Sequence, residues 1–302
     1  MNTGRFLAAL KRAAPLVIDG GLATQLEAQG CDISNALWSA SLLLDQPEAI
    51  VAANRAFIQA GAECIATASY QASREGFAQR GIPAEKSDEL MKLSVELAVQ
   101  ARGNSDALIA ASIGPYGAIL HDGSEYRGDY GVSADALRTF HAERLNLFDK
   151  SEADILACET IPSKLEAEVL AELLAVCETP AWVSFSCPDA EHISDGTPVE
   201  EAAAVFTAHP GVLAVGINCT PPQYVTQLIT RLGEVLPDKA IIAYPNSGET
   251  WDAETGEWFG TASPIDFANA ARDWVSAGAD IVGGCCRTDP EYISVLRAAV
   301  QA

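Results

Sequence analysis

The sequence has few basic residues for its length, no long hydrophobic run and no low-complexity linker. It holds 41 acidic residues against 19 basic ones among 302, which gives a formal net charge of −22. A chain with this much negative charge repels a phosphate backbone and an anionic lipid surface. We therefore expect no nucleic-acid partner and no membrane partner. We therefore expect a cytoplasmic protein with small-molecule partners. Because no segment is dedicated to oligomerisation, we expect it to be a monomer.

No targeting or membrane-spanning segment is visible. The apolar run between Arg5 and Lys11 is too short for a signal peptide. The longest charge-free stretch, Ala202 to Thr230, is interrupted by Pro210 and by a Pro-Pro pair, so it does not predict a membrane helix. Without a secretory signal, the eight cysteines should be mostly reduced thiols. Clustered cysteines in such a chain indicate metal binding or catalysis before disulfides.

Short β-rich runs alternate with longer segments of helical periodicity. The runs are nearly continuous in apolar or small residues, which is typical of parallel strands buried on both faces. Eight runs are present: Leu16–Asp19, Glu63–Ser69, Ala107–Ile113, Asp154–Glu159, Ala181–Ser186, Val212–Cys219, Ala240–Tyr244 and Asp280–Gly284. They predict an α/β fold, a single-domain (β/α)8 TIM barrel over residues 1–302. The alternative is a doubly wound sheet, but the glycine pair after the first run lacks the dinucleotide-binding pattern.

Helix signals lie between these runs. Apolar residues recur at helical spacing in Pro47–Ala60, Pro83–Arg102 and Ser133–Lys150. Ser163 with Glu166 predicts a capping box, and Ser263 followed by proline predicts another helix start. Gly61 and Gly278 each stand just before a strand, where glycine favours a left-handed helix end.

In such a barrel, catalytic groups lie at the carboxyl ends of the strands. The polar residues predicted at that edge are Asp19, Thr67, Ser69, Glu159, Thr160, Ser186, Asn218, Cys219, Asn246, Cys285 and Cys286. Strands six and eight are near neighbours around the barrel, so three of these cysteines can converge at its mouth. Zinc favours thiolate ligands, and a catalytic zinc site has three protein ligands and one open position. The vicinal pair can share one metal only where the strand has ended and turned, for which Gly283 and Gly284 supply backbone freedom.

Several other interpretations of these residues stay open. Cysteines are often small buried hydrophobic residues, and we expect this for Cys31, Cys64, Cys158, Cys177 and Cys187. A redox-active vicinal disulfide is a further alternative for the adjacent pair. Two glycines after the last strand also suit phosphate binding, which is common in barrels. Schiff-base chemistry is disfavoured, because none of the six lysines falls at the carboxyl end of a predicted strand.

At these residues the sequence resembles the homocysteine S-methyltransferase family. The resemblance covers nearly the whole chain and rests on the segments IDGGLATQLE (18–27), TASYQAS (67–73), ACETIPS (157–163), GINC (216–219), YPNSGE (244–249) and GGCCRT (283–288). Two further segments, SIGPYGA (112–118) and DGSEYRGDY (122–130), are similar to the subgroup that uses S-methylmethionine as methyl donor. The resemblance implies a barrel that binds one Zn²⁺ through Cys219, Cys285 and Cys286 and methylates homocysteine to give methionine.

The resemblance also implies roles for other residues. Glu159, assisted by Asp19, corresponds to the position that takes the homocysteine ammonium, although a helix-capping role is an alternative for Asp19. Gly20, Gly21 and Thr67 correspond to positions that meet the amino-acid carboxylate. Thr67 is alternatively an ordinary strand residue.

The implied donor is a sulfonium cation, which an aromatic face attracts. Five aromatic residues lie in the loops that follow the strands, where they bind the donor or simply pack the loops: Trp38, Tyr70, Tyr116, Tyr126 and Tyr130. Glu125 and Asp129 are candidates for the donor's ammonium or are solvated loop charges. Asn218 and Ser247 are weaker candidates for hydrogen bonds in the site.

Departures from other branches of the family narrow the expectation. Gln71 and Thr160 stand where betaine-using relatives carry tyrosines, and no folate or cobalamin module follows the barrel. Adenosylmethionine is a second candidate donor, because it carries the same methylsulfonium on a larger body. Three alternatives remain: a selenocysteine methyltransferase, a non-catalytic zinc-binding barrel, and a phosphate-binding lyase or isomerase with incidental cysteines.

Overall fold

The centre of the molecule is a sheet of parallel strands. The computed structural model describes residues 3–33, 38–252, 257–259 and 262–301. The strand order is β1-β10-β7-β6-β5-β4-β3-β2. These strands are β1 (Leu16–Val17), β2 (Cys64–Ala66), β3 (Leu108–Ile113), β4 (Ile155–Ile161), β5 (Ala181–Phe185), β6 (Val212–Asn218), β7 (Ala240–Tyr244) and β10 (Ile281–Val282). A bridge between Ile18 and Cys64 joins the two edges, so the sheet closes into the predicted (β/α)8 barrel.

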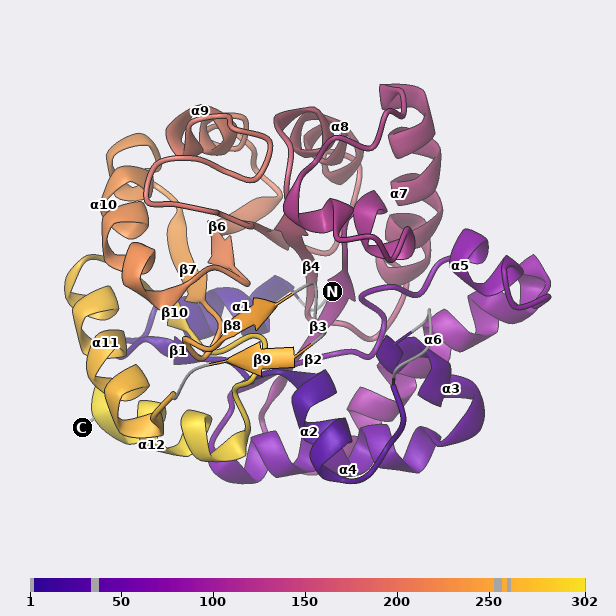
Figure 1. Cartoon of the computed structure of the whole chain (residues 1–302), viewed down its shortest axis with the longest axis horizontal. Helices are drawn as coiled ribbons and strands as arrows, with labels where there is room; N and C mark the ends of the chain where they lie inside the picture. Colours follow the sequence, from indigo (N-terminus) through magenta and orange to yellow (C-terminus); the bar gives the residue numbers. More distant parts are fainter. Residues whose placement is uncertain (1–2, 34–37, 253–256, 260–261, 302) are drawn as a thin grey trace.

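Helices between the strands form an outer ring around this barrel (Figure 1). The longer ones are α4 (Pro47–Ala60), α6 (Ala84–Arg102), α7 (Ala134–Phe148), α8 (Lys164–Leu174), α10 (Val225–Val235), α11 (Pro264–Ser276) and α12 (Pro290–Val300). Shorter helical segments are α2 (Leu22–Ala28), η1 (Trp38–Ser41), α3 (Leu42–Asp45), α5 (Arg74–Ala78), η2 (Tyr116–Ile119), η3 (Ser124–Tyr126), α9 (Val199–Ala204) and η4 (Pro222–Tyr224).

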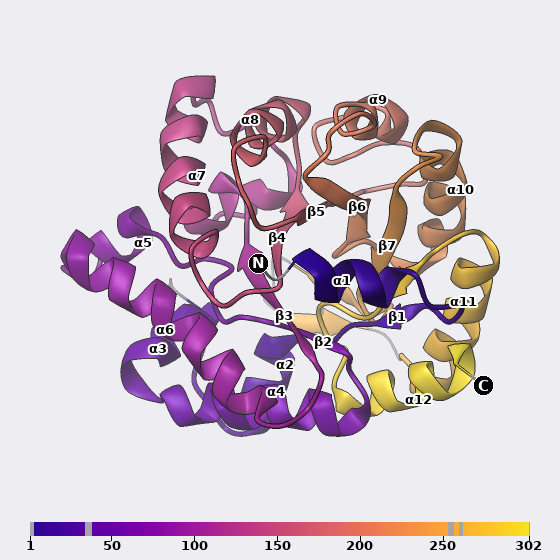
Figure 2. The same ribbon diagram turned by 180° about the vertical axis from the view of Figure 1, so that it is seen from behind.

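The two ends of the barrel are covered differently. Helix α1 (Thr3–Leu10) crosses the amino-terminal end, which faces the viewer in Figure 2. Its Phe6 is fully buried, with its ring centroid 6.1 Å from that of Trp182, and Arg5 pairs with the buried Asp154 at 2.9 Å. At the opposite end, an antiparallel ribbon of β8 (Thr250–Asp252) and β9 (Glu257–Phe259) lies over the strands (Figure 1). The carboxyl ends of the strands therefore remain available for a site beneath this ribbon.

Two layers of apolar side chains make up the core. The inner layer fills the barrel and includes Phe6, Ile18, Trp182 and Ile242. The outer layer packs the other face of the strands against the helices. Burial on both faces explains why the strands are apolar almost throughout.

Most of the predicted elements are confirmed. Strand β7 and helix α4 span the predicted residues, and the other strand predictions err mainly at their ends. Ser163 and Ser263 cap helices α8 and α11 by accepting from the backbone N–H groups of Glu166 and Asp266. The predicted return bond of the capping box, from the Ser163 N–H to the Glu166 side chain, is wrong. The Glu166 carboxylate instead bonds to Tyr116, Tyr130 and His141. Gly61 is left-handed at the end of α4, as predicted, with φ of 107°.

Three features of the structure differ from expectation. The sequence missed the β8–β9 ribbon and helix α1. The runs predicted for β1 and β10 are longer than the strands, because the backbone leaves the ladder before the polar residues of the site.

Among the described helices, none combines the length and apolar content needed to cross a lipid bilayer.

Candidate metal and substrate site

Three sulfur atoms converge at the carboxyl end of the barrel. Cys219 follows β6, and Cys285 and Cys286 follow β10. The three Sγ atoms all lie within 4.8 Å of one another. Those of Cys219 and Cys285 are joined as a disulfide, with their Cα atoms 5.5 Å apart, whereas Cys286 is a free thiol. Thiols that converge on one point can bond to each other as well as to a cation, so the disulfide is compatible with a candidate metal site in the reduced cluster.

The backbone turns sharply at this cluster. Cys219 is in the left-handed region, with φ of 47°, and Arg287 has φ of 64°. Gly283 and Gly284 do not have positive φ. They are needed for close approach, because a Cβ on Gly284 would run into the Thr288 side chain. The predicted turn after the last strand is therefore confirmed, but the reason given for the glycine pair is wrong.

The cluster fits a tetrahedral metal. Zinc bound to thiolates at about 2.3 Å would hold its sulfur ligands about 3.8 Å apart, within the 4.8 Å span of the three sulfurs. The Cys219–Cys285 disulfide would have to be reduced and its two sulfurs would have to separate before they could share the metal. Burial raises the pKa of the Cys286 thiol to about 11, so a nearby cation is needed to keep this sulfur as a thiolate at neutral pH. Cys31, Cys64, Cys158 and Cys187 are buried apolar thiols as expected, and Cys177 is half-buried.

Two carboxylates lie beside the cluster, Asp19 buried and Glu159 partly buried. The Asp19 Oδ2 atom accepts a hydrogen bond of 2.7 Å from the Ala66 backbone N–H, across the mouth of the barrel. Burial, together with the neighbouring Glu159 charge, raises the pKa of Asp19 from 3.8 to about 7. Burial also raises the pKa of Glu159. The capping alternative for Asp19 is not observed, because the N-cap of α2 is Gly21. The pair is thus an electronegative pocket suited to an ammonium group.

Glu159 is held by hydroxyl groups that the sequence did not single out. Ser112 Oγ donates to Glu159 Oε1, and Tyr244 OH donates to Oε2 at 3.0 Å. The Tyr244 hydroxyl also lies 2.6 Å from Ser184 Oγ and accepts from Trp182 Nε1 at 3.2 Å. Tyr244 looks like an ordinary buried residue at a strand end, and the YPNSGE segment was the one signal that could have pointed to it.

Asn218 links the thiol cluster to the end of β4. Its Oδ1 accepts from the Thr160 backbone N–H at 2.7 Å, and its Nδ2 donates to Thr160 Oγ1 at 2.7 Å. The same Nδ2 lies 4.0 Å from Cys285 Sγ. Thr160 has φ of 60°, so these bonds hold a left-handed residue in place between Glu159 and the sulfurs. The weaker sequence candidate Asn218 is therefore a buried element of the site.

The remaining candidates for the homocysteine carboxylate already have protein partners. The Gly21 N–H donates to the Thr288 carbonyl at 2.8 Å, and a Cβ on Gly20 would lie 2.5 Å from that oxygen. Thr67 Oγ1 is buried, lies 2.6 Å from Ser69 Oγ and accepts from the Ser112 N–H. These residues therefore build the tight turn and strand end that surround the carboxylate pair. Ser247 is buried, and its N–H donates to the Cys286 carbonyl.

The candidate aromatic residues do not all face the sulfurs. Tyr126 lies near the Cys286 thiol, and Tyr70 lies near Thr160. Tyr116 instead packs on Tyr130 and Phe140, with ring centroids 5.7 and 5.2 Å away. The structure thus brings Tyr70 and Tyr126 to the site.

Trp38 begins η1, and its side chain lies outside the described residues. Its candidate contact with the donor therefore stays a prediction.

A further carboxylate, that of the buried Glu166, anchors the loop that carries Tyr126. Glu166 accepts from the Tyr116 N–H at 2.7 Å and from the Tyr130 hydroxyl at 2.9 Å. His141 Nε2 lies 2.8 Å from the same carboxylate, and both side chains are fully buried. The sequence missed this role, because Glu166 matched a local capping pattern.

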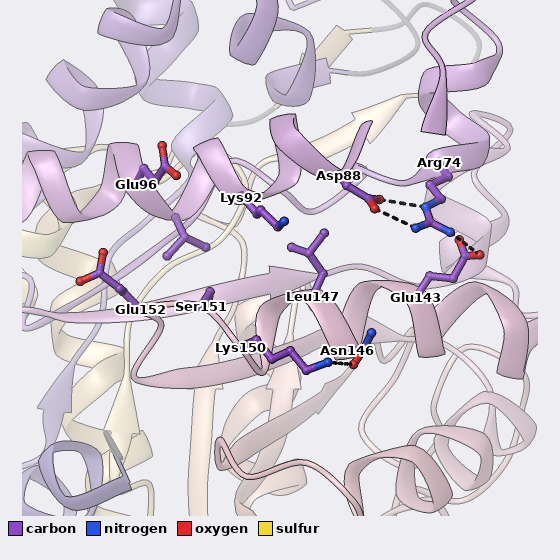
Figure 3. Close-up of a pocket in the computed structure, with 11 residues that line it drawn as sticks. Arg74, Asp88, Lys92, Glu96, Glu143, Asn146, Leu147, Lys150, Ser151 and Glu152 are labelled. Atoms are coloured by element: carbon purple, nitrogen blue, oxygen red, sulfur yellow. Dashed lines mark hydrogen bonds and ion pairs between the residues drawn. The ribbon is translucent and has the colours of Figure 1, made fainter. Parts of the chain in front are cut away.

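A groove on the described surface lies away from these residues. It has a volume of about 630 Å³ and runs along α6 and α7 on the outside of the barrel (Figure 3). Arg74 in this groove pairs with Asp88 and Glu143, and Lys150 donates to Asn146. None of the three cysteines and neither carboxylate of the candidate site lines this groove, so it shows no sign of the predicted chemistry.

Comparison with known proteins agrees with this site. A family model described as homocysteine S-methyltransferase matches residues 16–300. The chain is 46% identical over 295 residues to the homocysteine S-methyltransferase YbgG of Bacillus subtilis (strain 168), covering 94% of this chain and 93% of that protein. It is 42% identical over 302 residues to a selenocysteine Se-methyltransferase of Brassica oleracea var. italica, covering 93% of this chain and 87% of that protein.

Solved structures agree as well. The metallated form of the homocysteine methyltransferase MmuM from Escherichia coli matches with a TM-score of 0.87 and 41% identity, covering 97% of this chain and 99% of that one. The oxidized form of the same enzyme matches with the same TM-score and identity, and the alignment covers 99% of both chains. Likeness of this extent makes the fold and the site comparable along nearly the entire chain.

Proposed function

The chain belongs to the homocysteine S-methyltransferase family, and we propose that it moves a methyl group from S-methylmethionine to homocysteine at a zinc ion held by Cys219, Cys285 and Cys286. The observation that carries this proposal is the convergence of the three sulfurs within 4.8 Å, beside the carboxylates of Asp19 and Glu159. Three ligands leave the fourth tetrahedral position for a substrate sulfur.

The metal and the protein divide the work. Zinc, when bound, supplies the positive charge that deprotonates a coordinated thiol near neutral pH. Glu159 and Asp19 hold the homocysteine ammonium, and Tyr244 and Ser112 keep Glu159 oriented by hydrogen bonds. We propose that the homocysteine carboxylate lies at the turn of Gly20 and Gly21, near Thr67, where the Gly21 N–H would exchange its bond to the Thr288 carbonyl for one to the substrate.

The reaction needs no general acid. The homocysteine thiol loses its proton to solvent, its sulfur forms a bond to the methyl carbon, and the bond from that carbon to the donor sulfonium breaks. The donor leaves as a neutral thioether, which needs no proton. In this proposal Tyr70 and Tyr126, which lie near Thr160 and Cys286, offer aromatic faces to the sulfonium. The protein therefore acts chiefly by positioning the two substrates and by supplying the metal site.

Selenocysteine is a second candidate acceptor. The 42% identity to a selenocysteine Se-methyltransferase motivates it, because the same cluster would serve a selenolate. A direct comparison of the two acceptors tests it. Equal or faster turnover of selenocysteine would overturn homocysteine as the preferred acceptor.

The test of function is formation of methionine by reduced, zinc-loaded protein supplied with homocysteine. S-methylmethionine and adenosylmethionine are offered separately, with a chelator-stripped control. We expect zinc-dependent turnover that is faster with S-methylmethionine. Faster turnover with adenosylmethionine would overturn the donor, and no methionine from either donor despite bound zinc would overturn the methyl transfer itself.

A further inference from the structure

Glu125, in η3 beside the thiol cluster, has a buried oxygen that the protein does not satisfy. Its Oε2 atom is shielded from solvent and has no hydrogen-bond partner in the described structure. The adjacent Arg127 is bound instead by Asp122 and Asp129. A buried carboxylate oxygen without a donor is costly, so native structures usually provide a partner. The unsatisfied Oε2 atom therefore suggests that a bound ligand supplies the missing donor, a cationic N–H group.

The surroundings of Glu125 are those of the candidate donor site. Burial is the main cause of the raised pKa values of Tyr70 and Cys286, and the charge of Glu125 adds to both. Tyr126 follows Glu125 directly in η3. The carboxylate is therefore close to two aromatic side chains and to one of the three sulfurs. Burial raises the pKa of Glu125 itself as well, as expected for an acid that lacks a partner.

The loop holds Glu125 in place before any ligand binds. A Cβ on Gly117 would lie 2.6 Å from the Glu125 backbone nitrogen, so η2 and η3 pack in close contact. The Ser186 hydroxyl donates to the Glu125 carbonyl at 3.2 Å, which ties η3 to the end of β5. Glu166 fixes both ends of the loop through Tyr116 and Tyr130. Such preorganisation is what a binding residue on a loop requires.

The other acids of this loop are solvated. The side chain of Asp129 is 75% exposed and bonds to Arg127, and that of Asp122 is 54% exposed. Of the two acids considered from the sequence for the donor's ammonium, the structure therefore favours Glu125. Asp129 is the matched control, because it has the same charge in the same loop.

We propose that Glu125 accepts the α-ammonium group of the methyl donor, while Asp19 and Glu159 hold the ammonium of homocysteine. The proposal rests on the proposed function, in which both substrates are α-amino acids. A sulfonium has no N–H to donate, so the unsatisfied oxygen selects the ammonium and leaves the sulfonium to the tyrosines. Three carbons separate the two cationic groups of S-methylmethionine, so an ammonium at Glu125 leaves the sulfonium within reach of the sulfurs.

This assignment has a kinetic signature. The ammonium keeps its charge throughout the reaction, so Glu125 binds it equally in the ground state and in the transition state. Loss of such uniform binding raises KM for the donor and leaves kcat unchanged. KM for homocysteine should not move, because its ammonium lies at the other carboxylates.

The test removes the interaction from both sides. Wild type and Glu125→Gln are assayed with S-methylmethionine and with the dimethylsulfonium acid of the same carbon skeleton that lacks the amino group. We expect wild type to prefer the amino donor by about tenfold to hundredfold in kcat/KM, the effect of one hydrogen bond to a charged group. Glu125→Gln should lose most of this preference, and Asp129→Asn should retain it.

Other outcomes overturn the inference. A preference that persists in Glu125→Gln, or equal losses on both donors, would contradict it. If Glu125→Gln does not fold, Glu125→Asp should still weaken the preference, because the shorter carboxylate is withdrawn. If wild type forms no methionine from either sulfonium donor, the proposed function fails, and calorimetric binding of the same two compounds then decides the inference. Equal effects of the substitution on both affinities would overturn it.

Discussion

At the scale of single residues, the site depends on two acids, Asp19 and Glu159. Their surroundings destabilise the charged carboxylates, and a bound cationic substrate can stabilise them. Burial raises the pKa of Asp19 to about 7, with Glu159 as a like-charged neighbour. Folded protein therefore keeps a proton on Asp19 at pH values where the unfolded chain has lost it. This costs stability in the substrate-free state and favours the binding of a cation.

Asp19 should make stability fall as the pH rises. Its pKa is 3.8 in the unfolded chain and about 7 when folded, so the free energy of unfolding should fall between these values, by at most about 1.4 kcal/mol per pH unit. Asp19→Asn should make that slope shallower in urea unfolding of metal-free protein. The exposed Asp129→Asn should leave the slope unchanged. An unchanged slope in Asp19→Asn would show that Asp19 ionises normally.

Tyr244 should affect homocysteine binding and not donor binding. Tyr244→Phe removes the hydroxyl that donates to Glu159 at 3.0 Å, and so raises the pKa of that carboxyl further. We expect KM for homocysteine to rise about tenfold, shifted most at low pH, with little change in KM for the donor. Tyr292→Phe is the control, because its ring packs on Phe267 in the outer helices. Equal changes for both substrates would indicate general damage to the barrel.

Residue types at strand ends could be predicted from the sequence, but their partners could not. The cysteines, Asp19 and Glu159 were found because each follows a long apolar run. Tyr244 and Glu166 were missed, since a tyrosine ending a strand and an acid in a first helical turn have ordinary explanations. Their roles arise from contacts such as Glu166 with Tyr130, 36 residues apart.

At the scale of elements, the loop of η2 and η3 is held by one buried carboxylate. Glu166→Gln removes the negative charge of the carboxylate that Tyr116, Tyr130 and His141 contact through hydrogen bonds. We expect the free energy of unfolding to fall by about 1–3 kcal/mol and amide exchange in residues 115–131 to become faster. Relative to wild type, KM for the donor should rise more than KM for homocysteine. Glu168→Gln is the control, because its pair with Lys164 is exposed. Exchange that is unchanged in this loop would contradict the anchoring role.

Elements with one strong period were predictable, and those built by tertiary contact were not. Helix α4 carries proline at its start and Gly61 at its end, so local signals define both limits. The β8–β9 ribbon has three residues per strand, which is too short for a periodic pattern. Helix α1 is stabilised by contacts such as Arg5 with Asp154, 149 residues away.

At the scale of the whole molecule, the net charge of −22 suits a cationic donor. S-methylmethionine carries one net positive charge, whereas homocysteine is a neutral zwitterion. Raising the salt concentration from about 0.02 M to about 0.3 M shortens the Debye length and should raise KM for the donor a few-fold. KM for homocysteine should change much less. An equal response of the two substrates would show that the field of the protein does not assist donor binding.

The sulfur coordination of zinc tests the central claim most directly. X-ray absorption of the reduced, zinc-loaded protein should show about three sulfur ligands at about 2.3 Å, and about four when homocysteine is added. That result would confirm a triad of Cys219, Cys285 and Cys286 with an open position for the substrate. A sulfur count that homocysteine leaves unchanged would contradict the account.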